Sequence, residues 1–306
     1  MMENKKGLLL VFFTAIVSGF SIFINSFGVK GFDSSVFTFS KNVVVALLLF
    51  SIIIFLKRFN ELKKLNKKHW LQLVGIGFIG GSIPFLLYFK GLQMVTVTAA
   101  GFIHKTMFIY VAVFALLFLK EKLTKGIFFG ALFLLVGNYF IIMPDFNLSL
   151  GYALILIATV LWAAENTLAK YVLKELPGTI VAFGRMFFGS LLILMFLLIT
   201  GKASIIFSMS YTQYLWILLT AAFLLIYVFT YYNGLKLIKV TTASCILALG
   251  APITTLLGFA FNRVAISLYE GLGMLLIVAG VISVIWLSKI ISFATNIFTI
   301  GQDERN

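Results

Sequence analysis

Five ionisable side chains lie inside long apolar stretches of this sequence: Lys41, His104, Lys105, Glu165 and Arg185. A charge within hydrocarbon costs about 2.5–3.5 kcal/mol on insertion scales, so each of these residues needs a partner or a water-filled cavity. A buried carboxylate can carry a proton or contact an amine, whereas a lysine or arginine can bind a carboxylate or a phosphate. These residues are therefore the first candidates for a substrate-binding site.

The stretches around these residues are predicted membrane spans. The chain has 61% hydrophobic and only 11% charged residues and a mean hydropathy of +1.10, whereas about a quarter of the residues in a soluble domain are charged. A helix of about 20 apolar residues crosses a bilayer. The sequence predicts an all-α membrane protein with ten transmembrane helices, at 7–27, 35–56, 70–89, 96–119, 126–143, 150–173, 179–200, 212–235, 240–260 and 267–288.

The distribution of positive residues predicts the orientation of these helices. Of the 24 lysines and arginines, 17 fall in segments that an internal N-terminus places in the cytoplasm, and four fall in external loops. Cytoplasmic loops carry such an excess, so we predict a multi-pass protein of the cell membrane with both termini cytoplasmic. The first apolar run has no small-residue cleavage site after its core and is predicted to be retained. The net charge of +14 thus reflects topology, and the expected partner is the lipid bilayer, not a nucleic acid.

The chain contains an internal repeat with an offset of about 143 residues. The segment Tyr88–Ala100 aligns with Tyr231–Ala243 with identity at six of thirteen positions, and Gly130 and Gly137 align with Gly273 and Gly280. Each half then contains five helices, and an odd number inverts the second half in the membrane. We predict two inverted-topology five-helix repeats, at 1–143 and 150–288, followed by a cytoplasmic tail at 289–306.

These features resemble the EamA-type transporters of the drug/metabolite transporter superfamily. The resemblance rests on Leu119-Lys-Glu-Lys-Leu-Thr124 with the glycines that follow it, on the Gly91-Leu92 and Gly234-Leu235 turns, and on Pro252. The second half departs from this pattern with Val264 in the place of Glu121, and the first half has Ile109 in the place of Pro252. The resemblance implies ten helices around a central cavity and movement of amino acids or other small metabolites, often outward. A sister branch exchanges phosphorylated sugars or nucleotide sugars.

The depth of each buried charge predicts which of them can meet. Glu165 and Arg185 both lie roughly 10 Å from the cytoplasmic boundary, on consecutive helices. They could form a structural ion pair or a switch that opens during transport. Lys41, His104 and Lys105 lie in the outer half, where the first five spans offer no acidic partner. They predict a wet cavity that accepts an anion, although Lys41 could reach the outer headgroups and His104 could be a packed core residue.

Several uncharged residues are predicted to line the same cavity. Asn25 ends a polar stripe along the first helix, and Trp162 and Asn166 lie near Glu165 on the sixth. The alternative for such residues is hydrogen bonding between helices, which is common in membranes. Tyr88 and Tyr231 are repeat mates that could cap the cavity or belong to the interfacial aromatic belt.

The predicted function is export of a small metabolite, an amino acid or a related carboxylate, by alternating access. An exchanger of organic phosphates or nucleotide sugars is the alternative, and a channel or a membrane-embedded enzyme is a more remote one. The single Cys245 and the absence of metal-ligand spacing predict no metal and no cofactor. Proton coupling is possible, and the assembly could be a monomer or a homodimer.

Overall fold

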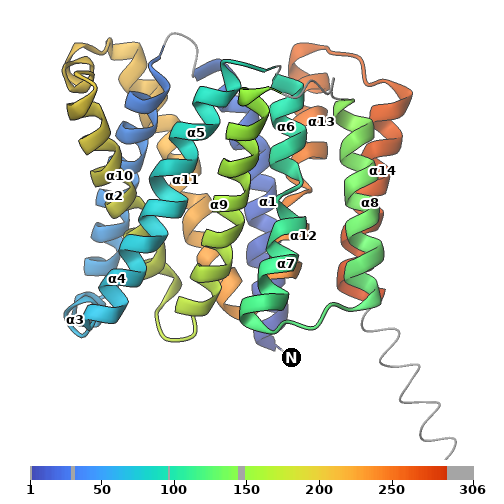
Figure 1. The fold of residues 1–306 in the computed structure, drawn as a ribbon, viewed down its shortest axis with the longest axis horizontal. Coiled ribbons are helices and arrows are strands. Elements are labelled where there is room, and N and C mark those ends of the chain that lie inside the picture. The colour runs from blue at the N-terminus through green and yellow to red at the C-terminus, as the bar shows by residue number, and fades with distance from the viewer. Residues whose placement is uncertain (1, 29–31, 96, 144–148, 288–306) are drawn as a thin grey trace, which may run out of the picture.

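A computed structural model describes residues 1–306 except 1, 29–31, 96, 144–148 and 288–306, so the predicted tail lies outside the described residues. Ten helical segments of the described chain are long and apolar enough to cross a membrane. This confirms the all-α prediction. The spans stand side by side as a bundle with their ends in two layers (Figure 1).

In chain order, the first five spans are α1 (Met2–Gly28), α2 (Ser34–Phe55), α4–η1–α5 (Lys67–Ile76, Gly77–Ser82 and Ile83–Leu92), α6–α7 (Val97–Lys105 and Met107–Leu119) and α8 (Lys125–Ile142). The second five are α9 (Leu150–Val172), α10 (Gly178–Ile199), α11 (Tyr211–Leu237), α12–α13 (Val240–Leu247 and Gly250–Asn262) and α14 (Leu268–Ile282), which continues as the π-turn η3 (Ser283–Leu287). A short helix, α3 (Phe59–Lys63), and a 3₁₀ helix, η2 (Ala203–Ser208), lie between spans.

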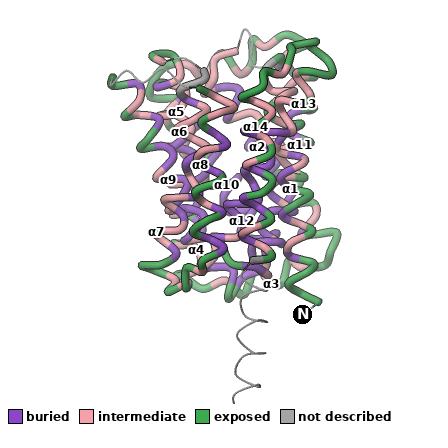
Figure 2. Tube along the Cα trace, turned by 90° about the vertical axis from the view of Figure 1, so that its right-hand side faces the viewer, coloured by how far each residue is buried: buried purple, intermediate pink, exposed green. Residues whose placement is uncertain are grey.

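The helices bury apolar side chains and some polar ones inside the bundle, and they also turn many large apolar side chains outward. Buried residues occupy the middle of the bundle, and exposed residues are frequent at its two ends (Figure 2). Outward-facing side chains such as Phe118 and Phe128 are 71% and 68% exposed to solvent in the absence of lipid. This pattern is expected for a membrane protein, because lipid tails solvate apolar side chains and helices associate through close packing.

The inverted repeat is visible in how helices of the two halves pack. A methyl group added to Gly137 would lie 2.7 Å from the carbonyl oxygen of Gly273, and one added to Gly273 would lie 2.6 Å from that of Gly137. Gly130 and Gly280 approach each other in the same reciprocal way. Gly137 meets Gly273, and their repeat mates Gly280 and Gly130 meet each other in the same way. The helices α8 and α14, adjacent in Figure 1, therefore contact each other across a pseudo-twofold axis.

The fourth and ninth spans are each interrupted near their middle, at equivalent positions of the repeat. The helices that follow the interruptions begin at Met107 and Gly250, which are 143 residues apart like the repeat itself. Bonds to the third preceding carbonyl occur there, including Thr106 N to Ile103 O and Leu249 N to Ile246 O, both 3.1 Å, and Thr106 N also bonds to Phe102 O at 3.2 Å. Our prediction of two continuous helices at 96–119 and 240–260 did not include these interruptions. Tight 3₁₀ turns within a helix often mark a functional hinge.

Candidate functional site

A π-helical turn in the third span, η1, provides the carbonyl groups around which the candidate site is built. A π-turn disturbs the regular helical ladder, so its carbonyls are available to side chains. The carbonyl oxygen of Gly80 accepts hydrogen bonds from Trp162 Nε1 and Arg185 Nη2, both at 3.1 Å. The carbonyl oxygen of Gly81 accepts one from Asn42 Nδ2 at 3.0 Å. Side chains from α9, α10 and α2 therefore converge on one turn.

Glycine at position 80 allows this convergence. A methyl group there would lie 2.2 Å from Cγ of Glu165 and 3.2 Å from Nε of Arg185, so any larger residue would displace both side chains. Gly81 lies equally close to α10, since a methyl group on it would be 2.4 Å from the carbonyl oxygen of Arg185. The π-turn is thus in direct contact with the two buried charges.

Glu165 and Arg185 lie on either side of Gly80 but do not form the direct ion pair that we considered. Glu165 is 1% exposed and accepts a hydrogen bond of 2.5 Å from the Tyr232 hydroxyl on α11. Arg185 is 8% exposed, donates to Gly80, and has a buried Nε without a hydrogen-bond partner among the described residues. Each charge is held by a different neutral group, so the two side chains are close but are not joined to each other.

Asn166 and Tyr231 form the next contact along α9 and α11. The Tyr231 hydroxyl donates a short hydrogen bond to Asn166 Oδ1, and Asn166 Nδ2 donates to the carbonyl oxygen of Trp162 at 2.7 Å. Tyr231 is 2% exposed. The alternative that placed Tyr231 in the interfacial aromatic belt is therefore wrong, because its ring packs inside the bundle.

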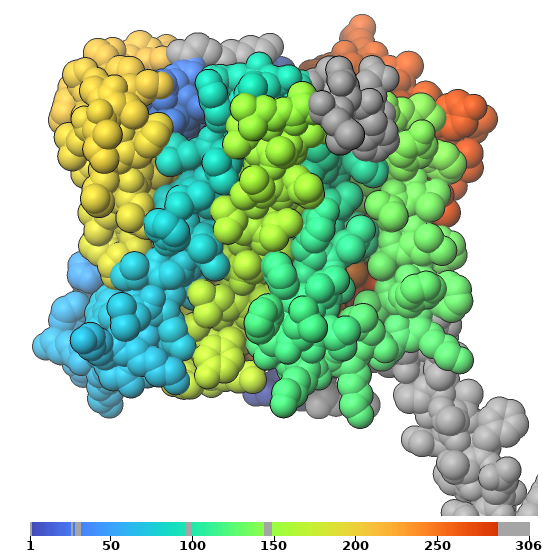
Figure 3. Space-filling model, in the orientation of Figure 1, coloured from blue at the N-terminus to red at the C-terminus, as the bar shows by residue number. Residues whose placement is uncertain are grey.

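Trp162 links these inner residues to the histidine of the fourth span. Its ring meets the rings of His104 and Tyr88 at centroid distances of 4.9 and 5.6 Å, and the Tyr88 and His104 rings are also 5.6 Å apart. The Nδ1 atom of His104 is buried without a hydrogen-bond partner in the described part of the chain. Figure 3 shows the outer side of this region, where α9 lies between α5 and the α6–α7 pair.

Lys105 follows His104 at the end of α6, directly before the interruption of the fourth span. Among the described residues its ammonium group has neither a hydrogen-bond partner nor an ion-pair partner. Of the three cations that we predicted inside the spans, Lys105 is thus the one whose side chain makes no hydrogen bond in the described part of the chain.

Lys41 and Asn25 lie together at a separate position between α1 and α2. Lys41 Nζ is 3.4 Å from Asn25 Oδ1 and 4.3 Å from the centroid of the Phe37 ring. Lys41 has no ion pair among the described residues, but a neutral amide and an aromatic face that we did not predict as its partners contact its charge. No contact of the described structure joins this pair to His104 and Lys105.

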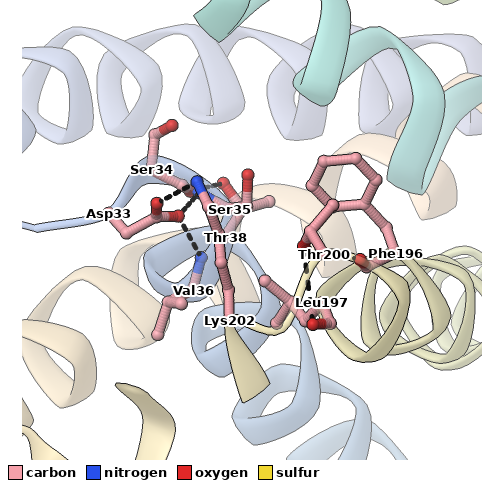
Figure 4. A network of polar contacts seen from close by, with 9 residues as sticks. All are labelled: Asp33, Ser34, Ser35, Val36, Thr38, Phe196, Leu197, Thr200 and Lys202. Carbon is pink, nitrogen blue, oxygen red and sulfur yellow. Dashed lines mark hydrogen bonds and ion pairs between the residues drawn. The ribbon is translucent and has the colours of Figure 1, made fainter. Parts of the chain in front are cut away.

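A network at the adjoining end of α2 was also not predicted. Asp33 caps α2 by accepting hydrogen bonds from Ser35 N and Val36 N, and its other oxygen is 2.7 Å from Lys202 Nζ (Figure 4). Burial by itself raises the pKa of Asp33, but the hydrogen bond from Lys202, the two backbone donors and the positive charge of Lys202 together hold it below its usual value. This contact joins the two halves at one end of the bundle.

The structure has a pocket of about 590 Å³ between α6 and α9, and no charged residue lines it. It is lined by Ile103, Ser149, Leu150, Tyr152, Ala153 and Leu156, and none of the predicted site residues lines it. An apolar recess on the face of a membrane bundle suits a lipid chain better than a charged metabolite. We do not assign it to the substrate.

The sequence offered weak signals for the residues that we did not predict. Tyr232 follows the repeat mate Tyr231, and Asn42 follows Lys41, so both were polar neighbours of predicted residues. Gly80 lies in a glycine-rich stretch, which is typical of close helix packing in membranes, but nothing in this stretch indicates which side chains bond to its carbonyl. The contacts depend on which helices become neighbours.

Two inverted five-helix halves around a buried polar site define a class of protein, the α-helical membrane transporter. The model of the EamA-like transporter family matches the chain twice, at residues 5–143 and 149–286, so this chain belongs to that family. Protein LicB of Haemophilus influenzae is 26% identical over 214 residues, which are 67% of this chain and 72% of that protein. A crystal structure of a protein with 16% identity superposes with a TM-score of 0.76 over 92% of this chain and 98% of that one, which shows the shared fold.

Proposed function

We propose that this protein is a secondary transporter that exports a small metabolite with an anionic group, an amino acid or a related carboxylate. The observation that carries the proposal is the Lys105 ammonium, which lies inside a span without a partner among the described residues. A lysine in that position is costly unless it faces water or a ligand. A carboxylate would supply the missing charge.

The position of Lys105 supports this role. It precedes the interruption of the fourth span, and the ninth span is interrupted at the equivalent position of the other half. Counted at 1.5 Å per residue, both interruptions lie roughly 14 Å from the nearer end of their spans, close to the middle of a bilayer about 30 Å thick. Paired interruptions of this kind mark the binding sites of inverted-repeat transporters.

The residues around Gly80 are proposed to act as the switch for alternating access between the halves 1–143 and 150–288. His104 contacts Trp162, Trp162 bonds to the carbonyl of Gly80, and Gly80 packs against Glu165. A movement at Lys105 can therefore reach Glu165 through the side chains of His104 and Trp162 and the backbone of Gly80. Glu165 is the only carboxylate among the buried residues of the described chain. It is the group that we propose to carry a coupling proton, since its hydrogen bond with Tyr232 can form in either protonation state.

Lys41 is proposed to have a secondary role in transport. Its bond to Asn25 supports attraction of an anion towards the bundle more than direct binding.

The excess of lysine and arginine in the connections on the N-terminal side supports the predicted orientation, in which both termini are cytoplasmic.

Transport by reconstituted vesicles tests the proposal. Radiolabelled amino acids, other carboxylates, sugar phosphates and nucleotide sugars are offered with and without a pH gradient, and Lys105→Gln is then assayed with the substrate that moves. We expect its flux to fall at least about 30-fold, since losing one partner of a buried charge pair costs about 2 kcal/mol or more.

Two variants serve as controls. Lys105→Arg retains the charge and should recover part of the flux, and Lys90→Gln removes an exposed lysine from the end of α5 and should behave as the wild type. Unchanged flux in Lys105→Gln, with normal insertion, would refute the assignment. If the vesicles transport sugar phosphates and no carboxylate, the substrate belongs to the alternative class, the organic phosphates.

A further inference from the structure

Glu121 holds the beginning of the ninth span from the opposite half of the protein. It lies in the linker between α7 and α8, and one of its carboxylate oxygens is 3.0 Å from Val240 N. The other accepts from Thr241 N at 3.4 Å and from Thr241 Oγ1 at 2.8 Å. A carboxylate at this position satisfies free N–H groups of α12 and opposes the positive end of its dipole.

A second charged side chain holds the end of the preceding helix. Lys170 Nζ on α9 donates to the carbonyl oxygens of Leu235 and Lys236, at 2.8 and 3.1 Å, where α11 ends. The short joint between α11 and α12 is therefore fixed on both sides by a charge of the sign that each helix end favours. Lys170 belongs to the same half as the joint. The joint is tied to the first half by Glu121, by a weaker bond of 3.4 Å from Lys239 Nζ to the carbonyl oxygen of Lys122, and by the packing of α1 against α11 and α12.

The equivalent contact is not available at the opposite end of the bundle. The repeat mate of Glu121 is Val264, which is 59% exposed and has no carboxylate. The backbone is nevertheless the same in both linkers, because Lys120 and Arg263 both have a φ of 54°. The two halves share the linker geometry, but only one linker carries a group that can grip a helix.

We propose that Glu121 is a positioning residue that latches α12, the half of the ninth span before its interruption, onto the first half. Release of this latch opens the end of the bundle that carries the N-terminus. The inference rests on the proposed function, since a latch has a role only if the two halves move. It adds a residue that touches no substrate and controls access from one side.

Cys245 provides a native reporter of this movement. It is the only cysteine of the chain, it lies within α12, and it is 2% exposed. A maleimide can reach this thiol only when α12 separates from its neighbours. The rate of maleimide labelling in purified, lipid-reconstituted protein therefore measures the opening of α12 without knowledge of the substrate.

Replacing Glu121 with alanine should accelerate labelling of Cys245 about tenfold, since loss of a side-chain cap shifts such an equilibrium by about that factor. Glu121→Gln retains an acceptor oxygen without the charge and should show about a threefold increase, and Thr241→Val should fall in the same range. Thr241→Val also tests the latch if Glu121→Ala fails to fold.

The matched control is Glu270→Gln. Glu270 also caps a helix, accepting from Ser267 N at 2.7 Å, but within its own helix α14 and its own half. Its replacement should leave the labelling rate within about twofold of the wild type. Equal acceleration in Glu270→Gln, or no acceleration in Glu121→Ala and Thr241→Val, would overturn the latch. Because labelling needs no substrate, a wild-type protein that moves none of the compounds offered contradicts the proposed function separately.

Discussion

Replacement of Gly80 by alanine tests the central contact of the candidate site. The added methyl carbon would lie 2.2 Å from Cγ and 2.8 Å from Cδ of Glu165, whereas carbon atoms pack best at about 3.5–4.0 Å. Glu165 must therefore retreat by more than about 1 Å, which breaks its 2.5 Å hydrogen bond with Tyr232. Overpacking costs about 1–3 kcal/mol and a lost hydrogen bond to a charged group about 1.5–3 kcal/mol, so we expect a total near 3 kcal/mol.

Gly75→Ala is the control for this replacement, because it lies in the same span. A methyl group at Gly75 would have its nearest neighbour, Leu168 Cδ2, at 3.6 Å, which is ordinary contact. Alanine should stabilise that helical position by about 0.5–1 kcal/mol. Thermal unfolding in nanodiscs, followed by tryptophan fluorescence, should show Gly80→Ala melting roughly 5–10 °C below the wild type. If Gly80→Ala has the same melting temperature as Gly75→Ala and transports normally, the contacts that converge on Gly80 are not important for the protein.

Two further predictions concern the packing of the halves. Gly137→Ala places a methyl group 2.7 Å from the carbonyl oxygen of Gly273, so it should lower the free energy of unfolding by about 1–3 kcal/mol. In the control Gly271→Ala the added methyl group meets nothing within 4 Å, and stability should not fall. The melting temperatures of the two variants test this difference. Lys202 and the backbone donors depress the pKa of Asp33 in the folded protein, against the effect of burial. The contribution of Asp33 to the stability of the fold is therefore present above the usual pKa of an aspartate, and it is lost as the pH falls through the pKa of Asp33 in the folded state. The free energy of unfolding of the wild type should therefore exceed that of Asp33→Ala by about 1 kcal/mol at pH 7. The same difference in stability under strongly acidic conditions would contradict this prediction.

Most of the fold could be predicted from local properties of the sequence. Apolar runs of membrane length gave ten spans, and the offset of 143 residues predicted the repeat whose equivalent glycines lie on α8 and α14. The interruption between Lys105 and Met107 was not predicted. The residues from His104 to Met107 include neither proline nor glycine, so they carry no turn signal that would distinguish a 3₁₀ turn from an α-helix.

The candidate site could be predicted only in part. Residue type and depth placed Glu165 and Arg185 near each other, and the structure confirms their proximity through Gly80. Their hydrogen-bond partners were not predictable, because Tyr232 and the Gly80 carbonyl come from other spans whose rotation the sequence does not specify. Lys41 shows the same limitation, since its bond to Asn25 depends on how α1 meets α2.

The sequence alone determined that this chain spans a membrane ten times and that its halves are inverted copies, because burial of apolar runs in lipid and an odd number of helices per repeat leave no other arrangement. Only the tertiary structure decided which charge is still free and which are held. A charge within a membrane is stabilised by whatever dipole lies within about 3 Å of it, and helices that are far apart in the chain supply those dipoles. Lys105 has none among the described residues, whereas Arg185 received the carbonyl of a π-turn 105 residues away.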